Sequence, residues 1–252
     1  IQEAENFNWD WRVWALVLVG AATMVLFFRW QSRQGGSALV PLALFQDRNF
    51  SLAGATISTV GFAISTYIIP WMIYVQTVQG FTPTQAALLV LPSGVVSGLL
   101  SPWVGKLTNT HDPKPFAITG LTLAALSMGI SALITTPAVD PRWMYAISVV
   151  YGVANSLMWG PLSMIATRNL DPRLAGAGSS VYNTTRQIGG VIGSAAIAAM
   201  MSSQLAAKLG DGAGAGDMAT AGQSTGPLPE ALHEPFALAM GNSIWLPCAV
   251  IA

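Results

Sequence analysis

Residues 49–105 read NFSLAGATISTVGFAISTYIIPWMIYVQTVQGFTPTQAALLVLPSGVVSGLLSPWVG and contain no charged side chain. A transmembrane helix needs about 20 mostly apolar residues to cross the hydrocarbon core of a bilayer, so this stretch is long enough for two crossings. The segment Gln79–Pro83 divides it, because Gly and Pro among polar residues are typical of a turn. The stretch therefore predicts two transmembrane helices joined by a short loop.

Five further stretches of similar apolar character occur along the chain. They lie near residues 11–28, 115–135, 144–166, 175–206 and 236–252. Only 9% of the 252 residues are charged and 52% are hydrophobic, whereas about a quarter of the residues of a soluble domain are charged. The sequence therefore predicts an all-α, polytopic helical membrane protein whose seven transmembrane helices lie in a lipid bilayer.

The charges of the loops predict how these helices are oriented. If the predicted spans alternate in direction, one set of loops holds the basic residues Arg29, Arg33, Arg48, Lys106, Lys114, Arg168 and Arg173. The opposite set holds Arg12, Arg142 and Lys208 together with most of the acidic residues. Lys and Arg are in excess on the cytoplasmic side of membrane proteins. We therefore expect the amino end of the chain to lie outside the cell.

The composition also excludes several classes of function. Eleven basic residues balance eleven acidic ones, and no basic stripe with interleaved aromatic residues occurs, so we expect no nucleic-acid partner. The single cysteine, Cys248, can form neither a disulfide within the chain nor a thiolate metal site, and we expect no metal and no cofactor. The second to seventh spans contain no Asp, Glu or His, which argues against an intramembrane enzyme.

The loop at 208–235 and the two ends of the sequence bear on its organisation. Residues 210–230 read GDGAGAGDMATAGQSTGPLPE, a composition that buries too little apolar surface to fold, so we expect 208–235 to be a flexible extracellular loop. The sequence opens on Ile1 and stops inside an apolar stretch. We interpret it as a fragment of a longer protein, with its last helix truncated.

Small residues at fixed spacing predict where helices pack. Gly94 and Gly98 lie four residues apart in the third span, as do Gly189 and Gly193 in the sixth. Such pairs let helix backbones approach each other in lipid, where the hydrophobic effect does little to hold helices together. We expect these glycines to serve helix packing rather than substrate binding.

Arg186 is the charge that the sequence places deepest in the membrane. It follows Pro172 by about fourteen residues, hence by roughly 20 Å along a helix, and Asn183 and Gln187 share its face of the helix. A charge at that depth is costly unless it faces the bundle interior or a water-filled cavity. Two interpretations remain open: Arg186 binds substrate, or it is a structural residue whose guanidinium holds carbonyl groups of neighbouring helices.

A second polar stripe predicts further cavity-lining residues. Asn155 and Trp159 recur at helical spacing on the fifth span, after Ser148, Tyr151 and Gly152. Tyr67 and Tyr74 on the second span and Asn242 on the last span offer similar aromatic and amide groups. We expect them to line a substrate cavity with Arg186, although ordinary polar contacts between helices explain each of them as well.

Three stretches of the sequence resemble a known family. They are VPLALFQDRNFSLA at 40–53, YVQTVQGFTPTQAALLVLP at 74–92 and AGAGSSVYNTTRQIGGVIGSA at 175–195. They resemble the fourteen-spanner drug:proton antiporters of the major facilitator superfamily, the group that includes EmrB and QacA. The resemblance implies that residues 1–48 hold the extracellular start, a linker transmembrane helix and a cytoplasmic connector. Residues 49–252 are then the carboxyl-terminal six-helix bundle.

The resemblance implies a function that the residues alone do not. A protein of this family is a secondary active transporter that exports hydrophobic or cationic drugs and other small molecules by alternating access, coupled to protons. The substrate lies between two six-helix bundles, so the partner of this chain is the missing amino-terminal half of the same protein. The loop GKLTNTHDPKP at 105–115 departs from the family pattern, because Asn109 stands where the family has an acid.

The expected location is the bacterial plasma membrane, which the chain crosses several times. Alternatives stay open at this point. Similar exporters carry lipids, siderophores or other metabolites. A non-transporting receptor or a channel is a less favoured alternative, because the sequence shows neither a symmetric pore motif nor a folded soluble domain.

Overall fold

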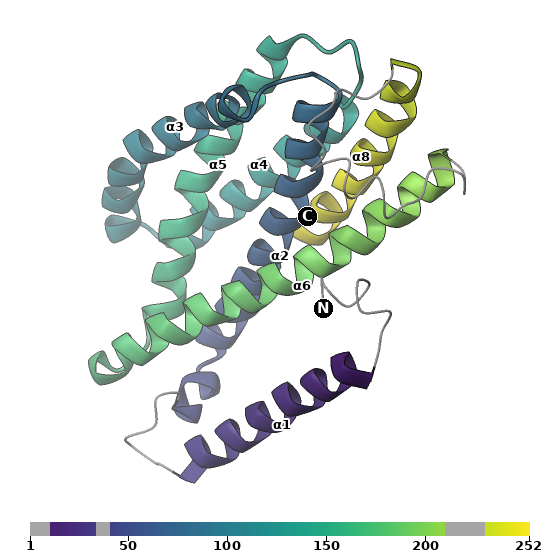
Figure 1. Cartoon of the computed structure of the whole chain (residues 1–252). Coiled ribbons are helices and arrows are strands. Elements are labelled where there is room, and N and C mark those ends of the chain that lie inside the picture. The colour runs from purple at the N-terminus through teal and green to yellow at the C-terminus, as the bar shows by residue number, and fades with distance from the viewer. Residues whose placement is uncertain (1–10, 34–40, 210–229) are drawn as a thin grey trace.

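The computed structural model describes residues 11–33, 41–209 and 230–252, and almost all of them are helical (Figure 1). Within these ranges the long helices are α1 (Trp11–Arg33), α2 (Arg48–Thr77), α3 (Pro83–Thr110), α4 (Pro113–Leu133), α5 (Pro141–Thr167), α6 (Ala175–Leu209) and α8 (Glu230–Ile251). Two short 3-10 helices, η2 (Leu42–Gln46) and η3 (Pro172–Leu174), precede α2 and α6. The predicted all-α fold with seven long helices is confirmed in the described part of the chain.

Five of these helices are long and apolar enough to cross a membrane. They are α2, α3, α4, α5 and α6 together with η3. The first helix, α1, carries a shorter apolar segment, Leu18–Gln31. Each predicted span therefore corresponds to a helix, and the five central helices meet the length and hydropathy of a transmembrane segment.

Aspartate followed by proline marks the beginning of α4 and of α5. Pro113 and Pro141 occupy the first helical position, where a missing N–H costs nothing. The residue before each is an aspartate that caps the helix. The backbone N–H of Lys114 donates to Asp112 at 3.3 Å, and the corresponding N–H after Asp140 donates at 2.8 Å. An Asp-Pro pair in the sequence thus marks where α4 and α5 start.

The turn between α2 and α3 is fixed by local hydrogen bonds. Thr82 and Gln85 form a reciprocal capping box at the start of α3. Gly80 has a φ angle of 68°, a left-handed conformation that glycine adopts without a steric penalty. The turn-rich break that divides residues 49–105 is therefore a tight connection between two antiparallel helices.

Hydrogen bonds and an ion pair show which loops share an end of the bundle. The Tyr74 hydroxyl donates to the Thr136 carbonyl oxygen at 2.6 Å, so the α2–α3 and α4–α5 connections lie together. At the opposite end Arg168 lies 3.7 Å from Asp112, so the α3–α4 and α5–α6 connections lie together. This second end, the basic end, carries Arg48, Lys106, Lys114, Arg168 and Arg173.

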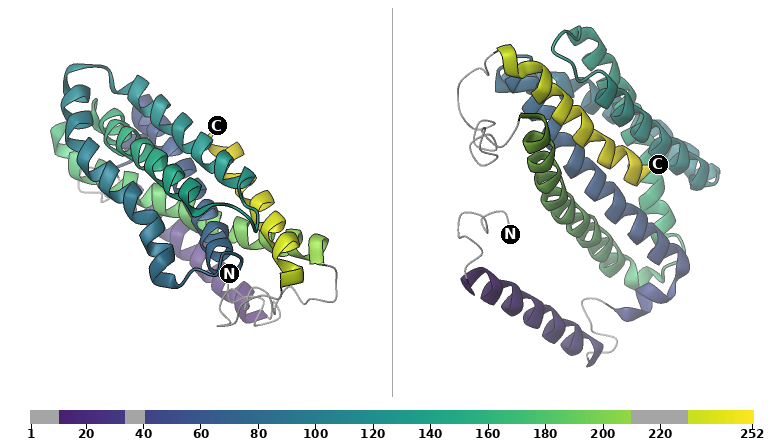
Figure 2. Two further views of the ribbon diagram at one scale, coloured as in Figure 1. Left: turned by 90° about the horizontal axis from the view of Figure 1, so that it is seen from above. Right: turned by 90° about the vertical axis from the view of Figure 1, so that its right-hand side faces the viewer.

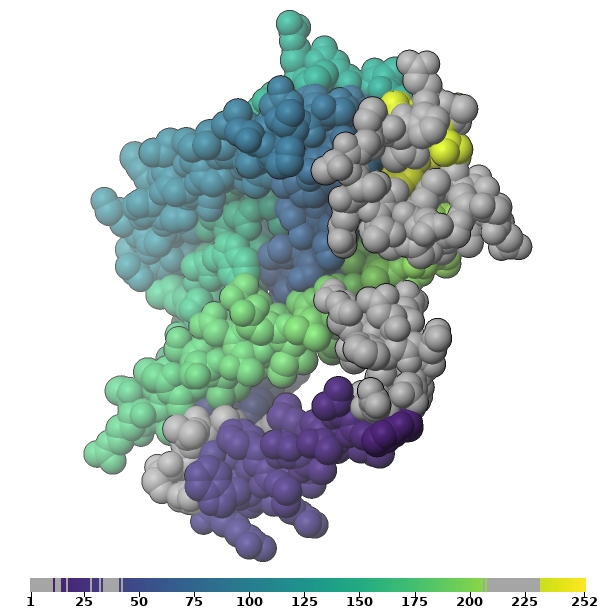
Figure 3. All heavy atoms as spheres, viewed as in Figure 1, coloured from purple at the N-terminus to yellow at the C-terminus, as the bar shows by residue number. Residues whose placement is uncertain are grey.

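The six helices α2 to α6 and α8 pack in two groups that meet where α8 packs on α4 and where α2 packs on α5. Helix α2 packs against α6 and α8, whereas α5 packs against α3 and α4. Figure 2 shows α2, α6 and α8 side by side in its right-hand view. Helix α8 also packs on α4, which closes the bundle on one side. Helix α1 lies outside this bundle, nearest to α6 in Figures 1 and 3.

The bundle has two apolar cores and an apolar outer surface. One core surrounds Tyr74, Met128 and Met240, and the other surrounds Phe50 and Met158 at the basic end. Large apolar side chains are also exposed on the outer faces, such as Leu99, Trp103, Ile118 and Val191. Exposed apolar surface of this extent is unusual in a soluble protein and suits contact with lipid.

Some predicted segments lie outside the described residues. These are the expected extracellular start at 1–10, part of the connector at 34–40, and residues 210–229 of the expected loop at 208–235. The remaining ends of that loop are helical, because α6 continues to Leu209 and α8 begins at Glu230. The flexibility of the loop and the domain boundaries stay predictions.

Candidate functional site

Helices α2 and α6 cross with their backbones in contact. A Cβ atom built on Gly189 would overlap the Ser58 carbonyl oxygen. A Cβ atom on Gly193 would lie 2.6 Å from the Phe62 carbonyl oxygen, closer than real Cβ atoms approach. No larger residue fits at these two positions while the helices keep this separation. The sequence Gly189-xxx-Gly193 thus lies along the backbone of α2.

The same crossing positions Arg186. Gly61 on α2 faces it, and a Cβ atom there would overlap the carbonyl oxygen of Arg186 and lie 3.3 Å from its Cγ atom. The half-buried side chain extends across α2 to α5, where its guanidinium carbon lies 5.5 Å from the centre of the Trp159 ring. This distance is within the range of a cation–π interaction. Gly61 therefore leaves the space through which Arg186 reaches a third helix.

Trp159 is held in place by its own helix. Its Nε1–H donates to the Oδ1 atom of Asn155 at 2.9 Å, and the Nδ2 group of Asn155 donates to the Tyr151 carbonyl oxygen at 3.1 Å. The three residues lie at four-residue spacing, hence on one face of α5. The predicted stripe on the fifth span is thus one connected group that begins beside Arg186.

Aromatic rings extend this group toward the opposite end of the bundle. The ring of Tyr151 lies 5.7 Å from that of Tyr67 on α2, which stacks on Trp71 at 6.0 Å. Trp71 in turn lies 5.8 Å from Tyr74. Pairs at these distances attract each other beyond the burial of their area. We call this group the aromatic row; it runs from Trp159 and Asn155 through Tyr151, Tyr67 and Trp71 to Tyr74.

The hydroxyls of Tyr67 and Tyr74 form hydrogen bonds with α4 and with the loop that follows it. The Tyr67 hydroxyl lies 3.0 Å from the hydroxyl of Ser131, which is fully buried. The Tyr74 hydroxyl donates to the Thr136 carbonyl oxygen, and it accepts a hydrogen bond from the side-chain amide of Gln79 at 2.8 Å. Both tyrosines are buried, so in this conformation they connect helices rather than face an open space.

Arg186 has no carboxylate partner in the described part of the chain. The ion pair found there, between Arg168 and Asp112, lies at the exposed basic end. The apolar segments of α2 to α6 contain no Asp or Glu at all. A guanidinium within a membrane-spanning helix, with an aromatic face as its neighbour and no acid, is the most unusual electrostatic feature of the bundle.

Tyr182, which precedes Arg186 by one helical turn, carries a buried hydroxyl without a partner in the described structure. The Tyr182 side chain is 6% exposed, and its hydroxyl has no hydrogen-bond partner among the residues described. Buried polar groups are almost always satisfied, so each exception requires an explanation. The Ser148 hydroxyl is a second such group, on the stripe of α5.

The other predicted cavity residues lie apart from this group. Asn183 and Gln187 are exposed on α6, and the amide of Asn183 donates to the Ser179 carbonyl oxygen of the same helix. Asn242 on α8 donates to Gln204 on α6 at 3.3 Å. The structure thus brings together Arg186, Trp159, Asn155, Tyr67 and Tyr74, and leaves these three amides outside the aromatic row.

Gly94 and Gly98 on α3 differ from the glycines of α6. Both are exposed, and a Cβ atom on either would have no neighbour within 4 Å in the described structure. Within α3 the contact with α5 is made instead at Ser93, whose carbonyl oxygen lies 2.6 Å from a Cβ atom built on Gly152. The expected packing role of Gly94 and Gly98 therefore stays a prediction.

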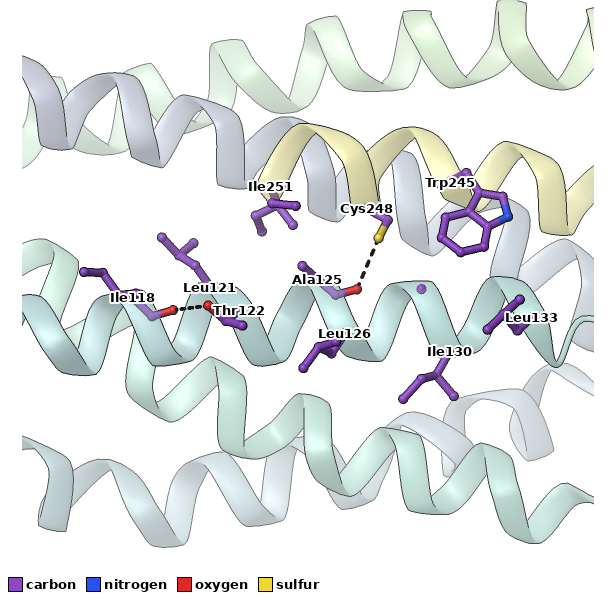
Figure 4. A pocket seen from close by; sticks show the side chains of 12 residues that line it. Ile118, Leu121, Thr122, Ala125, Leu126, Ile130, Leu133, Trp245, Cys248 and Ile251 are labelled. Atoms are coloured by element: carbon purple, nitrogen blue, oxygen red, sulfur yellow. Dashed lines mark hydrogen bonds between the residues drawn. The ribbon is translucent and has the colours of Figure 1, made fainter.

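An apolar pocket of about 570 Å³ lies between α4 and α8 (Figure 4). Its walls include Leu126, Ile130 and Trp245, and at its floor the Cys248 thiol lies 3.4 Å from the Ala125 carbonyl oxygen. None of the predicted site residues lines it. Its apolar lining suits an acyl chain of the surrounding lipid better than a polar substrate.

Sequence reasoning missed three residues of the site. Gly61 and Ser131 matter only because another helix lies against them, and nothing in the sequence around them indicates that neighbour. Tyr182 could have been found, since it precedes Arg186 by four residues and hence lies on the same face of α6. No group of three metal-binding side chains occurs in the ranges that the structure describes.

Comparison with known proteins gives the family. The sequence model of the Major Facilitator Superfamily matches residues 4–194. The MFS-type transporter Rv1250 of Mycobacterium tuberculosis is 38% identical over 99% of the chain and 43% of its own length. The multidrug resistance protein Stp of the same organism is 28% identical over 82% of the chain and 38% of its own length.

A third relative, the tetracycline resistance determinant of Streptomyces rimosus, is 29% identical over 81% of the chain and 60% of its own length. The chain thus spans less than two thirds of the length of each of these relatives. The family model covers most of the apolar helices described above. The chain therefore belongs to the Major Facilitator Superfamily, a family of membrane transporters and not of enzymes.

Proposed function

We propose that this chain is the carboxyl-terminal half of a longer secondary active exporter of the EmrB and QacA type. In this proposal α1 within residues 1–48 is a linker helix, and residues 49–252 form one of two six-helix bundles. The greater length of the relatives supports the existence of a further half. The observation that carries the transport role is Arg186, a half-buried charge within a membrane-spanning helix that adjoins the aromatic row.

The proposed substrates are hydrophobic or cationic drugs and other small molecules. Two relatives are named for multidrug resistance and for tetracycline resistance. Aromatic and amide groups such as Trp159 and Asn155 suit planar, largely apolar molecules, which they contact through ring faces and a few hydrogen bonds. Lipids, siderophores or other metabolites are the alternative substrates, and they belong in the same transport assay.

Proton coupling and orientation are part of the proposal. The apolar segments of this bundle contain no Asp, Glu or His, so a coupling acid belongs to the amino-terminal half. The basic end, with Lys106 and Lys114, faces the cytoplasm, and the amino end of the chain lies outside. The membrane is the bacterial plasma membrane, in keeping with the bacterial relatives.

Everted membrane vesicles test the export function. Vesicles from cells that express the complete transporter are energised with a pH gradient and supplied with ethidium or tetracycline. We expect uptake into these vesicles above that of vesicles without the transporter, and an uncoupler that collapses the gradient should abolish it. Equal uptake with and without the transporter, across drugs, lipids and siderophores, would reject the proposal.

A further inference from the structure

We infer that Arg186 binds a carboxylate of the transported molecule, and that the substrates of this site include organic anions or zwitterions with an apolar body. This inference rests on the proposed export function and adds a substrate class to the hydrophobic and cationic molecules named there. It starts from three observations: within the described residues the guanidinium has no acidic partner, the Tyr182 hydroxyl has no hydrogen-bond partner, and the ring of Trp159 is held beside the guanidinium.

The guanidinium of Arg186 has its hydrogen-bonding capacity unused. An arginine side chain carries five N–H donors in a planar fork that matches a carboxylate. Within the described residues none of these donors has a hydrogen-bond acceptor, and the recorded contact of the guanidinium is the Trp159 ring face. The ring of Trp159 accepts no conventional hydrogen bond, so the N–H groups of the guanidinium stay available to an oxyanion.

The depth of Arg186 makes an anionic partner energetically favourable. The residue lies eleven positions after the start of α6 at Ala175, hence roughly 16 Å from that helix end. Water reaches such a position only through a cavity, so the charge gains much from an opposite charge that arrives with the ligand. The described bundle supplies no acid at this level.

Tyr182 supplies a second donor close to Arg186. The tyrosine lies four residues before it on the same face of α6. Its hydroxyl is buried and donates to no group in the described structure. A hydroxyl left in this state is costly, and a ligand oxygen that accepts its hydrogen bond removes the cost.

Trp159, held by Asn155, defines the apolar side of the site. The hydrogen bond of 2.9 Å between Trp159 Nε1 and Asn155 Oδ1 holds the indole ring in one orientation. The ring therefore presents a rigid apolar surface next to the guanidinium. A ligand that uses both must carry its oxyanion next to an aromatic or other apolar group.

Two matched probes test the inference in the complete transporter. One is a rhodamine that carries a free carboxylate, and the other is its methyl ester, in which one methyl group replaces the negative charge. Efflux of each is measured in cells that express the wild type, Arg186→Gln, Tyr182→Phe or the control Arg168→Gln. The control removes an exposed arginine at the basic end of the bundle.

We expect Arg186→Gln to lower efflux of the carboxylate probe by about tenfold or more, since a charge-assisted hydrogen bond is lost. Tyr182→Phe should lower it several-fold and should leave folding intact. Efflux of the ester should fall less than efflux of the carboxylate probe in both variants, given that a neutral ester makes weaker hydrogen bonds with the guanidinium, so the ratio of carboxylate efflux to ester efflux should drop. Membrane abundance of each variant is measured in parallel.

Two results overturn the inference. Equal loss of both probes in Arg186→Gln at normal abundance means that the arginine pairs with an acid of the protein or only supports the bundle. Efflux of the ester without efflux of the carboxylate by the wild type means that the site rejects anions. Failure of the export function itself is distinguishable, because cells with and without the transporter then retain both probes and ethidium equally.

Discussion

The guanidinium carbon of Arg186 on α6 lies 5.5 Å from the centre of the Trp159 ring on α5, and the side chain reaches it across Gly61 of α2. Three helices thus meet at one charge. In lipid, where helices gain little from the hydrophobic effect on association, such contacts and close backbone packing determine how a bundle is held together.

The ring face of Trp159 should matter more to transport than its N–H group. We expect Trp159→Leu, which removes the ring face, to lower efflux of ethidium or tetracycline several-fold in the complete transporter. The cation–π contact that holds the guanidinium of Arg186 against this ring is then lost, and such a contact contributes about 0.5–2 kcal/mol. Trp159→Phe keeps a ring and should retain more of the activity. Initial efflux rates at matched abundance measure the difference. If Trp159→Leu and Trp159→Phe lower the initial efflux rate equally, the ring face has no role in transport.

Gly189 should tolerate no side chain. In Gly189→Ala the new methyl group would overlap the Ser58 carbonyl oxygen, so the helices must separate and we expect a loss of about 1–3 kcal/mol in stability. Thermal unfolding of the purified protein in detergent measures it.

The matched control for that variant is Gly94→Ala on α3, where the methyl group meets nothing within 4 Å of the described structure. Alanine favours a helix over glycine by up to about 1 kcal/mol, so this substitution should leave the unfolding temperature unchanged or raise it. A drop as large as that of Gly189→Ala would mean that Gly94 packs against a helix of the other half.

The hydrogen bond between Tyr67 and Ser131 should connect α2 to α4. Tyr67→Phe removes one hydroxyl, and we expect a loss of about 0.5–1.5 kcal/mol in the free energy of unfolding. Ser131 also donates to the Ser127 carbonyl oxygen at 2.8 Å, so it stays partnered. A double-mutant cycle with Ser131→Ala isolates the pair. Strictly additive losses would show that the two hydroxyls do not interact.

Tags inserted after Arg33 and after Asp140 should report opposite sides of the membrane. The first site follows α1 next to basic residues, and the second precedes α5 at the end away from the basic end. Cleavage of the tags by protease in intact cells and in everted vesicles measures the side. The proposed orientation requires the Asp140 tag to be cleaved in intact cells and the Arg33 tag in vesicles.

The helices could be predicted from the sequence because their signals are local. Apolar length and the Asp-Pro pairs, such as Asp140 and Pro141, lie within a few residues of the feature that they determine. Their positions follow from how many residues cross a bilayer and from which residues cap a helix.

The contacts between helices could not be predicted in the same way. The hydrogen bond between Tyr67 and Ser131 joins residues 64 positions apart, and the partner of Asn242 is on another helix. The same Gly-xxx-Gly spacing gives backbone contact at Gly189 and exposure at Gly94, because the neighbouring helix and not the spacing decides. The sequence predicts Arg186 from its depth and Trp159 from the spacing of its stripe, whereas the contact between the two follows only from the fold.

The glycine crossing of α2 and α6 has a mechanical consequence. At Gly189 and Gly193 no layer of side chains separates the two backbones, and even a methyl group would meet the carbonyl oxygens of Ser58 and Phe62. Close contact of this kind favours movement of α2 and α6 together if this half rocks during a transport cycle, and the backbone of Arg186 then moves with both helices.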